Sequence, residues 1–448
     1  MGLSKLYAKS LHIYDFRCFG QAVLELRYPS RPSPQPLELD NVNLILGDNA
    51  SGKSSVLRAL AIAVLAPVLL GSGFVPYRLV RRPNAKAALI KVRAVLESVE
   101  KQYRTPRSNT QRRAGQRNEV ELLARLIADR RGNRDRIDLR KTPPSPIKHL
   151  IQDDYSSAFF LAGYGATRRV EVGDFSESSA RKSRGLRYQR VAGLFEDHVT
   201  LRPLQSWLPR IKAEALRSAA IAQITKVLPK NIEFDGTFDD KENQYIFTMD
   251  GQETPFSSLS DGYKAFIGWV SDLIGHLCDI SKEDELALDA IPGMVLVDEI
   301  DLHLHPEWQR HVVPMVAHAF PKIQFVFTSH SPLVASTVRR QNIFVSDTAE
   351  DRTATIKQLQ ETVHGKSAEH ILLSSYFGLT TTRAASFQDE AERLFTRAAK
   401  GDKKAAMQYL TKLSAPIRKA RKEVVARAKG SRVKASGART TSRGRRKK

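Results

Sequence analysis

The residues of this chain best suited to chemistry form a complete phosphate-binding loop. They are Gly47, Asp48, Asn49, Ala50, Ser51, Gly52, Lys53, Ser54 and Ser55. A strand-like apolar run (42–46) precedes the loop and a helix-like run (55–60) follows it, which disfavours the alternative of a glycine-rich surface turn. Backbone N–H groups at the start of such a helix bind phosphates. We expect Lys53 to reach the β- and γ-phosphates of ATP and the Ser54 hydroxyl to coordinate Mg²⁺.

Two adjacent carboxylates follow a second strand-like run. The apolar residues 294–297 predict a buried parallel strand that ends in Asp298 and Glu299. We expect Asp298 to hold Mg²⁺, directly or through water, and Glu299 to orient and deprotonate the water that attacks the γ-phosphate. The alternative is a strand that ends in a solvated acidic turn.

Two further sites have the residue types that recognise phosphate. Ser260 and Gly262 open a predicted helix (265–280) and could form a second anion site, although a serine N-cap is the ordinary alternative. The apolar run 323–329 predicts another buried strand, which ends in His330. A strand paired near the carboxylate strand would place His330 where it can sense a γ-phosphate.

The order of these motifs resembles that of ATP-binding-cassette ATPases. After the phosphate-binding loop come Leu-Ser-Asp-Gly-Tyr (259–263), Val-Leu-Val-Asp-Glu (295–299) and Thr-Ser-His (328–330). Residues 11–19 resemble the "nFRxF" opening strand of the branch that contains the SMC, RecF and OLD proteins, and 298–306 resemble its "DExxxHLHP" segment. The resemblance implies an α/β P-loop ATPase head with a mixed or parallel sheet, a helical lobe and C-terminal helices.

The same resemblance implies an active site shared between two copies. Ser260 and Gly262 of one copy would close over the γ-phosphate bound by the other, so we expect a homodimer or a higher homo-oligomer with ATP between the heads. By this mapping Asp301 lies in the loop that crosses the interface, His330 is the switch histidine, and Arg17 of the opening strand joins the nucleotide-binding residues.

One departure from the family pattern concerns the segment after the predicted core strand 159–165. The family often places a glutamine there that touches Mg²⁺ and the attacking water. This chain continues instead with Ala166, Thr167 and Arg168. Arg168 or Thr167 are the candidates for that role.

Composition agrees with a water-soluble ATPase of the cytoplasm, without a membrane partner, but does not decide it. The hydrophobic content of 42% is enough for a core. Cys18 and Cys278, the only two cysteines, form neither a disulfide framework nor a metal-ligand spacing. The N-terminus is polar, and the longest apolar run (59–70) is too short to span a bilayer.

The net charge of +23 is concentrated in two segments. Residues 416–448 carry a net +13 and residues 101–148 a net +9, so the remainder is nearly neutral. Such segments attract nucleic acid without reading its sequence, and we expect binding through 101–150 and 416–448, to DNA or RNA. The alternative is a solvated charged surface with no partner. The tail is predicted to be disordered and residues 120–127 to form a short helix.

The predicted organisation has seven parts. They are the start of the ATPase core (1–100), a basic insertion (101–150), a core strand (151–169), a helical lobe with a hairpin (170–256), the motifs that complete the sheet (257–347), a C-terminal helical region (348–415) and the basic tail (416–448). Within the lobe, residues 204–227 read as helical, and 232–234 with 245–247 read as the hairpin. No sustained heptad repeat predicts a coiled-coil arm.

The segment after residue 330 separates the possible functions. It lacks the carboxylate constellation of the nuclease domain that follows in OLD proteins. Together with residues 366–372 and 377–379, this layout resembles stand-alone ATPases of anti-phage systems such as PtuA of Septu, which act beside a separate nuclease or effector. A RecF-like DNA repair ATPase and a weakly hydrolysing, ATP-gated binding module remain as alternatives, whereas a transporter ATPase is disfavoured.

Overall fold

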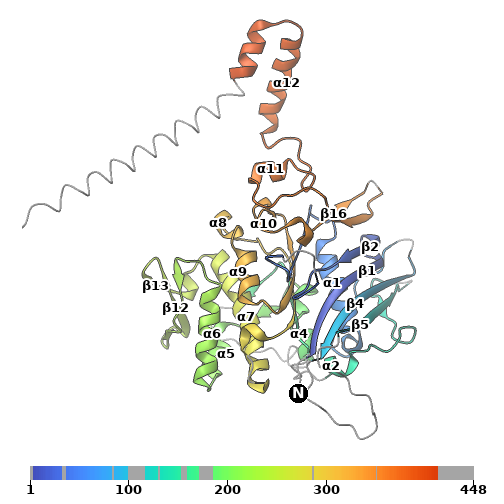
Figure 1. Cartoon of the computed structure of the whole chain (residues 1–448), viewed down its shortest axis with the longest axis vertical. Helices are drawn as coiled ribbons and strands as arrows, with labels where there is room; N and C mark the ends of the chain where they lie inside the picture. The colour runs from blue at the N-terminus through green and yellow to red at the C-terminus, as the bar shows by residue number, and fades with distance from the viewer. Residues whose placement is uncertain are drawn as a thin grey trace, which may run out of the picture. The chain divides into compact units, whose positions relative to one another are not determined.

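The computed structural model describes residues 4–32, 37–82, 85–98, 117–129, 132–152, 159–170, 185–284, 287–349 and 351–411. The chain divides into two units, Met1–Gly378 and Leu379–Lys448 (Figure 1). The basic tail (416–448) and residues 101–116 of the insertion, which include Tyr103, lie outside the described residues.

An eleven-stranded mixed sheet runs through the first unit, in the order β6-β5-β4-β1-β2-β17-β16-β3-β15-β14-β7. Its strands are β1 Ser4–Phe16, β2 Phe19–Glu25, β3 Val42–Gly47, β4 Ala87–Ser98, β5 Arg117–Ile127, β6 Arg136–Ile137, β7 Leu161–Tyr164, β14 Gly293–Val297, β15 Ile323–Ser329, β16 Ile343–Thr348 and β17 Ala354–Lys357. The strands β7, β14, β15, β3 and β16 are mutually parallel, and β6, β5, β4, β1 and β2 are antiparallel. The predicted α/β fold with a mixed sheet is confirmed.

Helices and two small sheets complete the described structure. The helices are α1 Lys53–Leu69, α2 Lys148–Gln152, α4 Leu186–Gln189, α5 Leu204–Trp207, α6 Glu214–Lys226, α7 Asp261–Asp284, α8 Pro306–Gln309, α9 Val312–Ala319, α10 Pro332–Ala335, α11 Ala368–Leu372 and α12 Ala385–Ala399. Single 3-10 turns are η1 Ala192–Leu194, η2 Leu208–Arg210, η3 Phe256–Ser258, η4 Leu288–Ala290 and η5 Arg340–Asn342. The short strands are β8 Arg169–Val170, β9 Thr200–Leu201, β10 Ile232–Glu233, β11 Phe238–Asp239, β12 Gln244–Met249 and β13 Gln252–Pro255.

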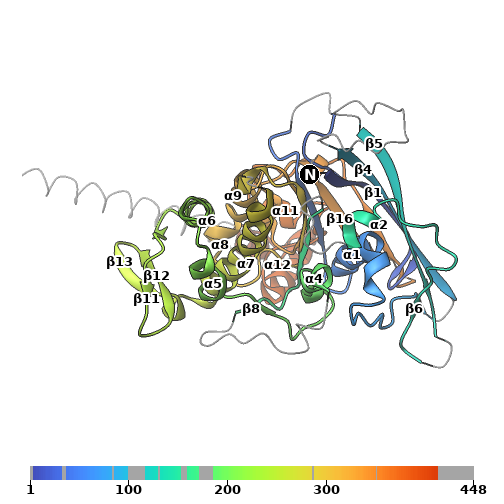
Figure 2. The same ribbon diagram turned by 90° about the horizontal axis from the view of Figure 1, so that it is seen from below.

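The parallel strands are buried on both faces, as their continuous apolar sequences predict. In β14, Val295 and Val297 belong to one hydrophobic cluster, and Met294 and Leu296 belong to another. Alternate residues of a strand point to opposite faces, so the two clusters are the two cores of the sheet. Helix α1 contributes to one core and α7 with α9 to the other, and Figure 2 shows α1 next to β4 and β5.

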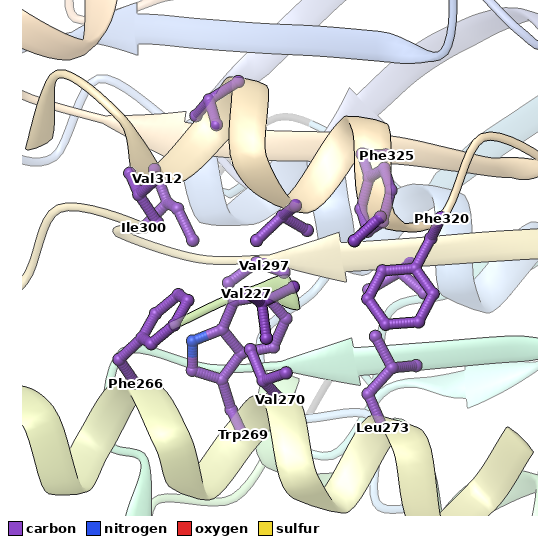
Figure 3. Close-up of a cluster of buried hydrophobic side chains, with 14 of the residues drawn as sticks. Val227, Phe266, Trp269, Val270, Leu273, Val297, Ile300, Val312, Phe320 and Phe325 are labelled. Carbon is purple, nitrogen blue, oxygen red and sulfur yellow. The ribbon is translucent and has the colours of Figure 1, made fainter. Parts of the chain in front are cut away.

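Large aromatic and aliphatic side chains attach α7 to the sheet. Figure 3 shows Phe266, Trp269 and Leu273 of α7 directed toward Val297 and Phe325 of the neighbouring strands. All five side chains are at most 2% exposed. Because α7 begins at the predicted serine-glycine motif and β14 ends at the carboxylates, this packing links the two motifs mechanically.

The structure corrects three sequence-based predictions. Residues 120–127, predicted to be a helix, belong to β5, because alternate residues rather than every third or fourth are buried: Leu122, Ala124 and Leu126 are fully buried. The helix predicted over 204–227 is interrupted, since Pro209 lies in η2 between α5 and α6. The sheet does not end at 347, because β17 pairs with β16 and β2.

Other predicted elements are confirmed. Strand β4 contains the alternating residues 90–96, β10 pairs with β12 in the predicted hairpin, and α7 spans the helix predicted over 265–280. The second unit contains α12, and among its described residues only Ala405 is buried. Within the parts of the chain that the structure describes, no helix has the length and apolar character needed to cross a bilayer.

Candidate functional site

The phosphate-binding loop lies between β3 and α1 and presents an uncapped helix N-terminus. Gly52 precedes the first residue of α1 with φ of 103°, and no side chain caps the helix. A Cβ at Gly52 would come within 2.6 Å of the Cys18 sulfur, so both backbone conformation and space require glycine. Ser55 N–H donates to the Gly52 carbonyl at 2.9 Å, which leaves the N–H groups of Lys53 and Ser54 for an anion.

Lys53 is held in this loop by backbone oxygen atoms. Its Nζ donates to the carbonyl of Gly47 at 2.9 Å and to that of Asp48 at 2.8 Å. Burial lowers the pKa of Lys53, and the nearby Asp298 and Glu299 partly oppose that shift. Because both hydrogen-bond acceptors are neutral carbonyls, they do not neutralise the positive charge of the ammonium group, which can therefore attract a phosphate.

A cavity of about 600 Å³ opens in front of the loop. It is lined by Arg17, Cys18, Asn49, Ala50, Gly52, Lys53, Ser54, Ser55, Arg58, Arg78, Val80, Arg82 and Glu299. Five of these side chains are cationic and one is anionic, which suits a polyanion such as a nucleoside triphosphate. The structure thus brings the predicted Arg17, Lys53, Ser54 and Glu299 to one cavity.

Sequence reasoning missed three arginines of this cavity. Arg78 and Arg82 follow α1 on a loop that the buried Asp135 holds: its Oδ2 accepts the N–H groups of Leu79 (2.6 Å) and Val80 (2.8 Å). Its Oδ1 pairs with Arg82 at 2.6 Å. The third arginine, Arg58, lies one helical turn after Ser54 in α1. This spacing is the one feature of the sequence from which a cavity arginine could have been predicted.

The two carboxylates leave β14 beside the end of β15, as the predicted strand pairing requires. The Thr328 hydroxyl of β15 donates to Asp298 Oδ1 at 2.5 Å and accepts the N–H of Glu299 at 2.7 Å. Glu299 has φ of 49°, a left-handed conformation that costs a non-glycine residue about 1–3 kcal/mol. His330 Nε2 lies 3.9 Å from Glu299 Oε1, so the histidine is next to the carboxylate that it was predicted to accompany.

Several buried polar atoms of the phosphate-binding loop and of the residues near Glu299 have no hydrogen-bond partner among the described residues. They are Ser51 Oγ, Arg168 Nη1, Asp301 Oδ1 and His330 Nε2. Buried polar groups are normally paired, so these four atoms are available to a ligand. Asp48 contributes to the loop through its backbone, since its carbonyl accepts from Lys53.

The residues predicted to hold Mg²⁺ have the right donor chemistry. Ser54 offers a hydroxyl and Asp298 a carboxylate, both hard oxygen ligands. Across the described residues, no group of three His, Cys, Asp or Glu side chains could hold a metal by itself. A site with one carboxylate and one hydroxyl fits an ion that shares its coordination with substrate phosphates and water, as Mg²⁺ does.

Ser260 and Gly262 are not among the residues that line the cavity. Ser260 is exposed directly before α7. Gly262 lies against the turn after the carboxylates, where an added Cβ would come within 2.3 Å of the His303 carbonyl oxygen. The serine and glycine therefore do not reach the phosphate-binding loop of their own chain, and their action on a second copy stays a prediction.

The structure distinguishes the two candidates for the role of the missing glutamine. Thr167 is exposed, whereas Arg168 is buried and its Nη2 donates to the Glu299 carbonyl at 2.6 Å. Burial lowers the pKa of Arg168 to about 10, against the opposing effect of Asp298, Asp301 and Glu299. The guanidinium thus lies among the carboxylates of the site.

Known proteins resemble this chain at the level of both sequence and structure. The Septu protein PtuA of Bacillus mycoides (strain KBAB4) is 28% identical over 225 residues, 50% of this chain and 30% of PtuA. The Retron Vc95 probable ATPase of Vibrio cholerae serotype O1 biovar El Tor is 44% identical over 93 residues, 21% of this chain and 18% of that protein. An SMC head bound to the C-winged helix domain of ScpA aligns with a TM-score of 0.45 and 13% identity, over 79% of this chain and 97% of that one.

The alignments with PtuA and the retron protein span less than a third of either relative. The resemblance to PtuA that the motifs predicted is nevertheless confirmed. A family described as "AAA domain, putative AbiEii toxin, Type IV TA system" matches residues 42–336, from β3 to the end of α10, and so includes the phosphate-binding loop, both carboxylates and His330. The chain therefore belongs to this family of AAA-domain ATPases.

Proposed function

We propose that this protein binds and hydrolyses ATP as a switch, and that ATP joins two heads. The observation that carries the proposal is that the phosphate-binding loop, with its Lys53, and Glu299 line the same cavity of about 600 Å³. Cationic walls bind the triphosphate, and a carboxylate is present where a water would attack it. A nucleotide-binding module without hydrolysis would have no need of Glu299 in that wall.

The residues divide the work of hydrolysis. The first-turn N–H groups of α1 and Lys53 bind the β- and γ-phosphates, and Glu299 takes a proton from the attacking water. Mg²⁺, held by Ser54 and Asp298, would neutralise charge on the phosphates. His330, 3.9 Å from Glu299, is placed to contact the γ-phosphate or the water.

The exposed position of the α7 N-terminus supports the proposed dimer. Ser260 is exposed and lies outside the cavity, so we expect a second copy to supply the serine and glycine that close over the γ-phosphate. Binding energy from this closure would make assembly depend on ATP, which is the physical basis of a switch.

The output of the switch is proposed from charge and from relatives. The basic segments 101–150 and 416–448 would bind nucleic acid through its phosphates. Similarity to PtuA and to a retron ATPase favours a role in anti-phage defence, in which ATP-dependent dimers control a separate nuclease or effector.

The variant Glu299→Gln tests the proposal. It removes the base but keeps the shape of the side chain, so we expect turnover to fall by about 10²–10⁴-fold while ATP binding persists. The trapped ATP complex should run as a dimer in size-exclusion chromatography with light scattering. Wild-type turnover would remove Glu299 from the mechanism, and a monomer at millimolar ATP would refute the shared site.

The same variant provides a test of the effector. Tagged Glu299→Gln protein, loaded with ATP and recovered from the native host, should carry a nuclease and nucleic acid with it. Tagged Lys53→Ala, which cannot hold the phosphates, is the matched control. Recovery of the same proteins with both variants would contradict ATP-dependent control.

A further inference from the structure

The backbone of Glu299 is held in a conformation that it would not adopt without support. Its φ of 49° is rare for a glutamate. Its N–H is bound by the Thr328 hydroxyl at 2.7 Å, and its carbonyl accepts from Leu302 N–H at 3.0 Å and from Arg168 Nη2 at 2.6 Å. Among these, the bond from Arg168 is the one made by a charged donor, and charged donors give the stronger bonds.

Arg168 reaches this carbonyl from the segment that follows the neighbouring strand β7. Strand β7 pairs with β14 in parallel, with Tyr164 opposite Val297, so the residues after both strands emerge at the same edge of the sheet. Asp298 N–H donates to the Tyr164 carbonyl at 2.8 Å and continues that pairing by one residue. The sheet thus places the segment that carries Arg168 at the same edge as Glu299.

Burial of this guanidinium is expensive and calls for a reason. Arg168 is 9% exposed, and its Nη1 has no partner among the described residues. Its Nη2 bond to the Glu299 carbonyl, together with the nearby carboxylates of Asp298, Asp301 and Glu299, offsets the cost of burying the charge. Arg168 itself does not line the ATP cavity, whereas Glu299 does.

From this geometry we infer that Arg168 is a positioning residue for hydrolysis: it fixes the Glu299 peptide so that the carboxylate faces the nucleotide cavity. The inference rests on the proposed role of Glu299 as the base. Arg168 acts through the Glu299 carbonyl rather than on the phosphates, so its loss should slow the chemical step and leave ATP binding nearly unchanged. Any side chain of similar length that donates one hydrogen bond to the Glu299 carbonyl should therefore support hydrolysis.

The test compares Arg168→Lys with Arg168→Met. Lysine and methionine have similar length, but only lysine can donate to the carbonyl. We expect Arg168→Met to lose about tenfold to a hundredfold in kcat, the loss of one hydrogen bond from a charged donor, with the KM for ATP within about threefold of wild type. Arg168→Lys should stay within about threefold of wild type in both constants. Arg169→Ala removes the same charge one residue away, at an exposed position, and should not change kcat.

Melting temperatures and circular dichroism accompany these measurements. Equal kcat for the Lys and Met variants, or a Met variant whose KM rises as much as its kcat falls, would overturn the inference. Should the Met variant not fold, a Lys variant with tenfold lower kcat at the wild-type melting temperature would also overturn it. Glu299→Gln measured in parallel separates the two proposals. Wild-type turnover of Glu299→Gln would refute the role of Glu299. An inactive Glu299→Gln variant together with a fully active Arg168→Met variant would refute the role of Arg168 alone.

Discussion

Thr328 connects the two carboxylates of the site, and the change Thr328→Val tests that connection. The hydroxyl is fully buried, donates to Asp298 at 2.5 Å and accepts from Glu299 N–H at 2.7 Å. Valine has the same shape but leaves the half-buried Glu299 N–H unpaired and removes a hydrogen bond to the Asp298 carboxylate. At about 1–3 kcal/mol for each of the two groups, we expect the free energy of unfolding to fall by about 2–6 kcal/mol.

The matched control is Thr328→Ser, which keeps the hydroxyl and loses one buried methyl group. Its expected cost is about 1 kcal/mol, so the serine variant should be more stable than the valine variant. Urea unfolding followed by tryptophan fluorescence measures this difference, because Trp207, Trp269 and Trp308 all lie in the first unit. A valine variant within about 0.5 kcal/mol of wild type would refute the reasoning, since it would mean that the two hydrogen bonds add no net stability.

Three further predictions concern the cavity and the charged segments. Burial raises the pKa of the Cys18 thiol, so its alkylation should be slow at neutral pH and accelerate only above the ordinary pKa range of thiols. Because Cys18 lines the cavity, ATP should block the reaction. Mass spectrometry should find the label at Cys18 and not at the buried Cys278. Asp135→Asn removes the negative charge that pairs with Arg82, so we expect a higher KM for ATP and a loss of about 1–3 kcal/mol in stability; an unchanged KM would show that the loop does not depend on this charge. Deletion of 416–448 should weaken DNA binding and reduce the slope of log affinity against log salt, and identical binding curves for both proteins would exclude the tail from binding.

Some functional residues could be found from the sequence alone, because they contact residues that are close to them in the chain. The phosphate-binding loop is one continuous turn, and Lys53 meets the carbonyls of Gly47 and Asp48 a few residues away. Asp298 and Glu299 follow an unmistakably apolar strand. For such sites, the spacing of residues along the chain and the periodicity of the strand are enough to predict which residues lie together.

Prediction failed where two periodicities compete or where contacts are distant. Residues 120–127 contain apolar residues on both sides of the chain, so their helical and strand patterns overlap, and only pairing with β4 decides for the strand. Likewise, β17 is short, and its place in the sheet depends on pairing with β16 and β2. The arginines at 78 and 82 carry no motif, and they reach the cavity because Asp135, more than fifty residues later, binds their loop.

By itself, the sequence determined the chemistry of this protein: a phosphate-binding loop, a pair of carboxylates after a buried strand, a histidine at the next strand end and two basic segments. Only the tertiary structure decided which side chains share the nucleotide cavity, that the serine-glycine motif lies outside it, and that Arg168 rather than Thr167 supports Glu299. The physical reason is that side-chain types and short spacings are local properties of the chain. The order of strands in the sheet is not local, and it brings residues 168, 299 and 328 together at one edge.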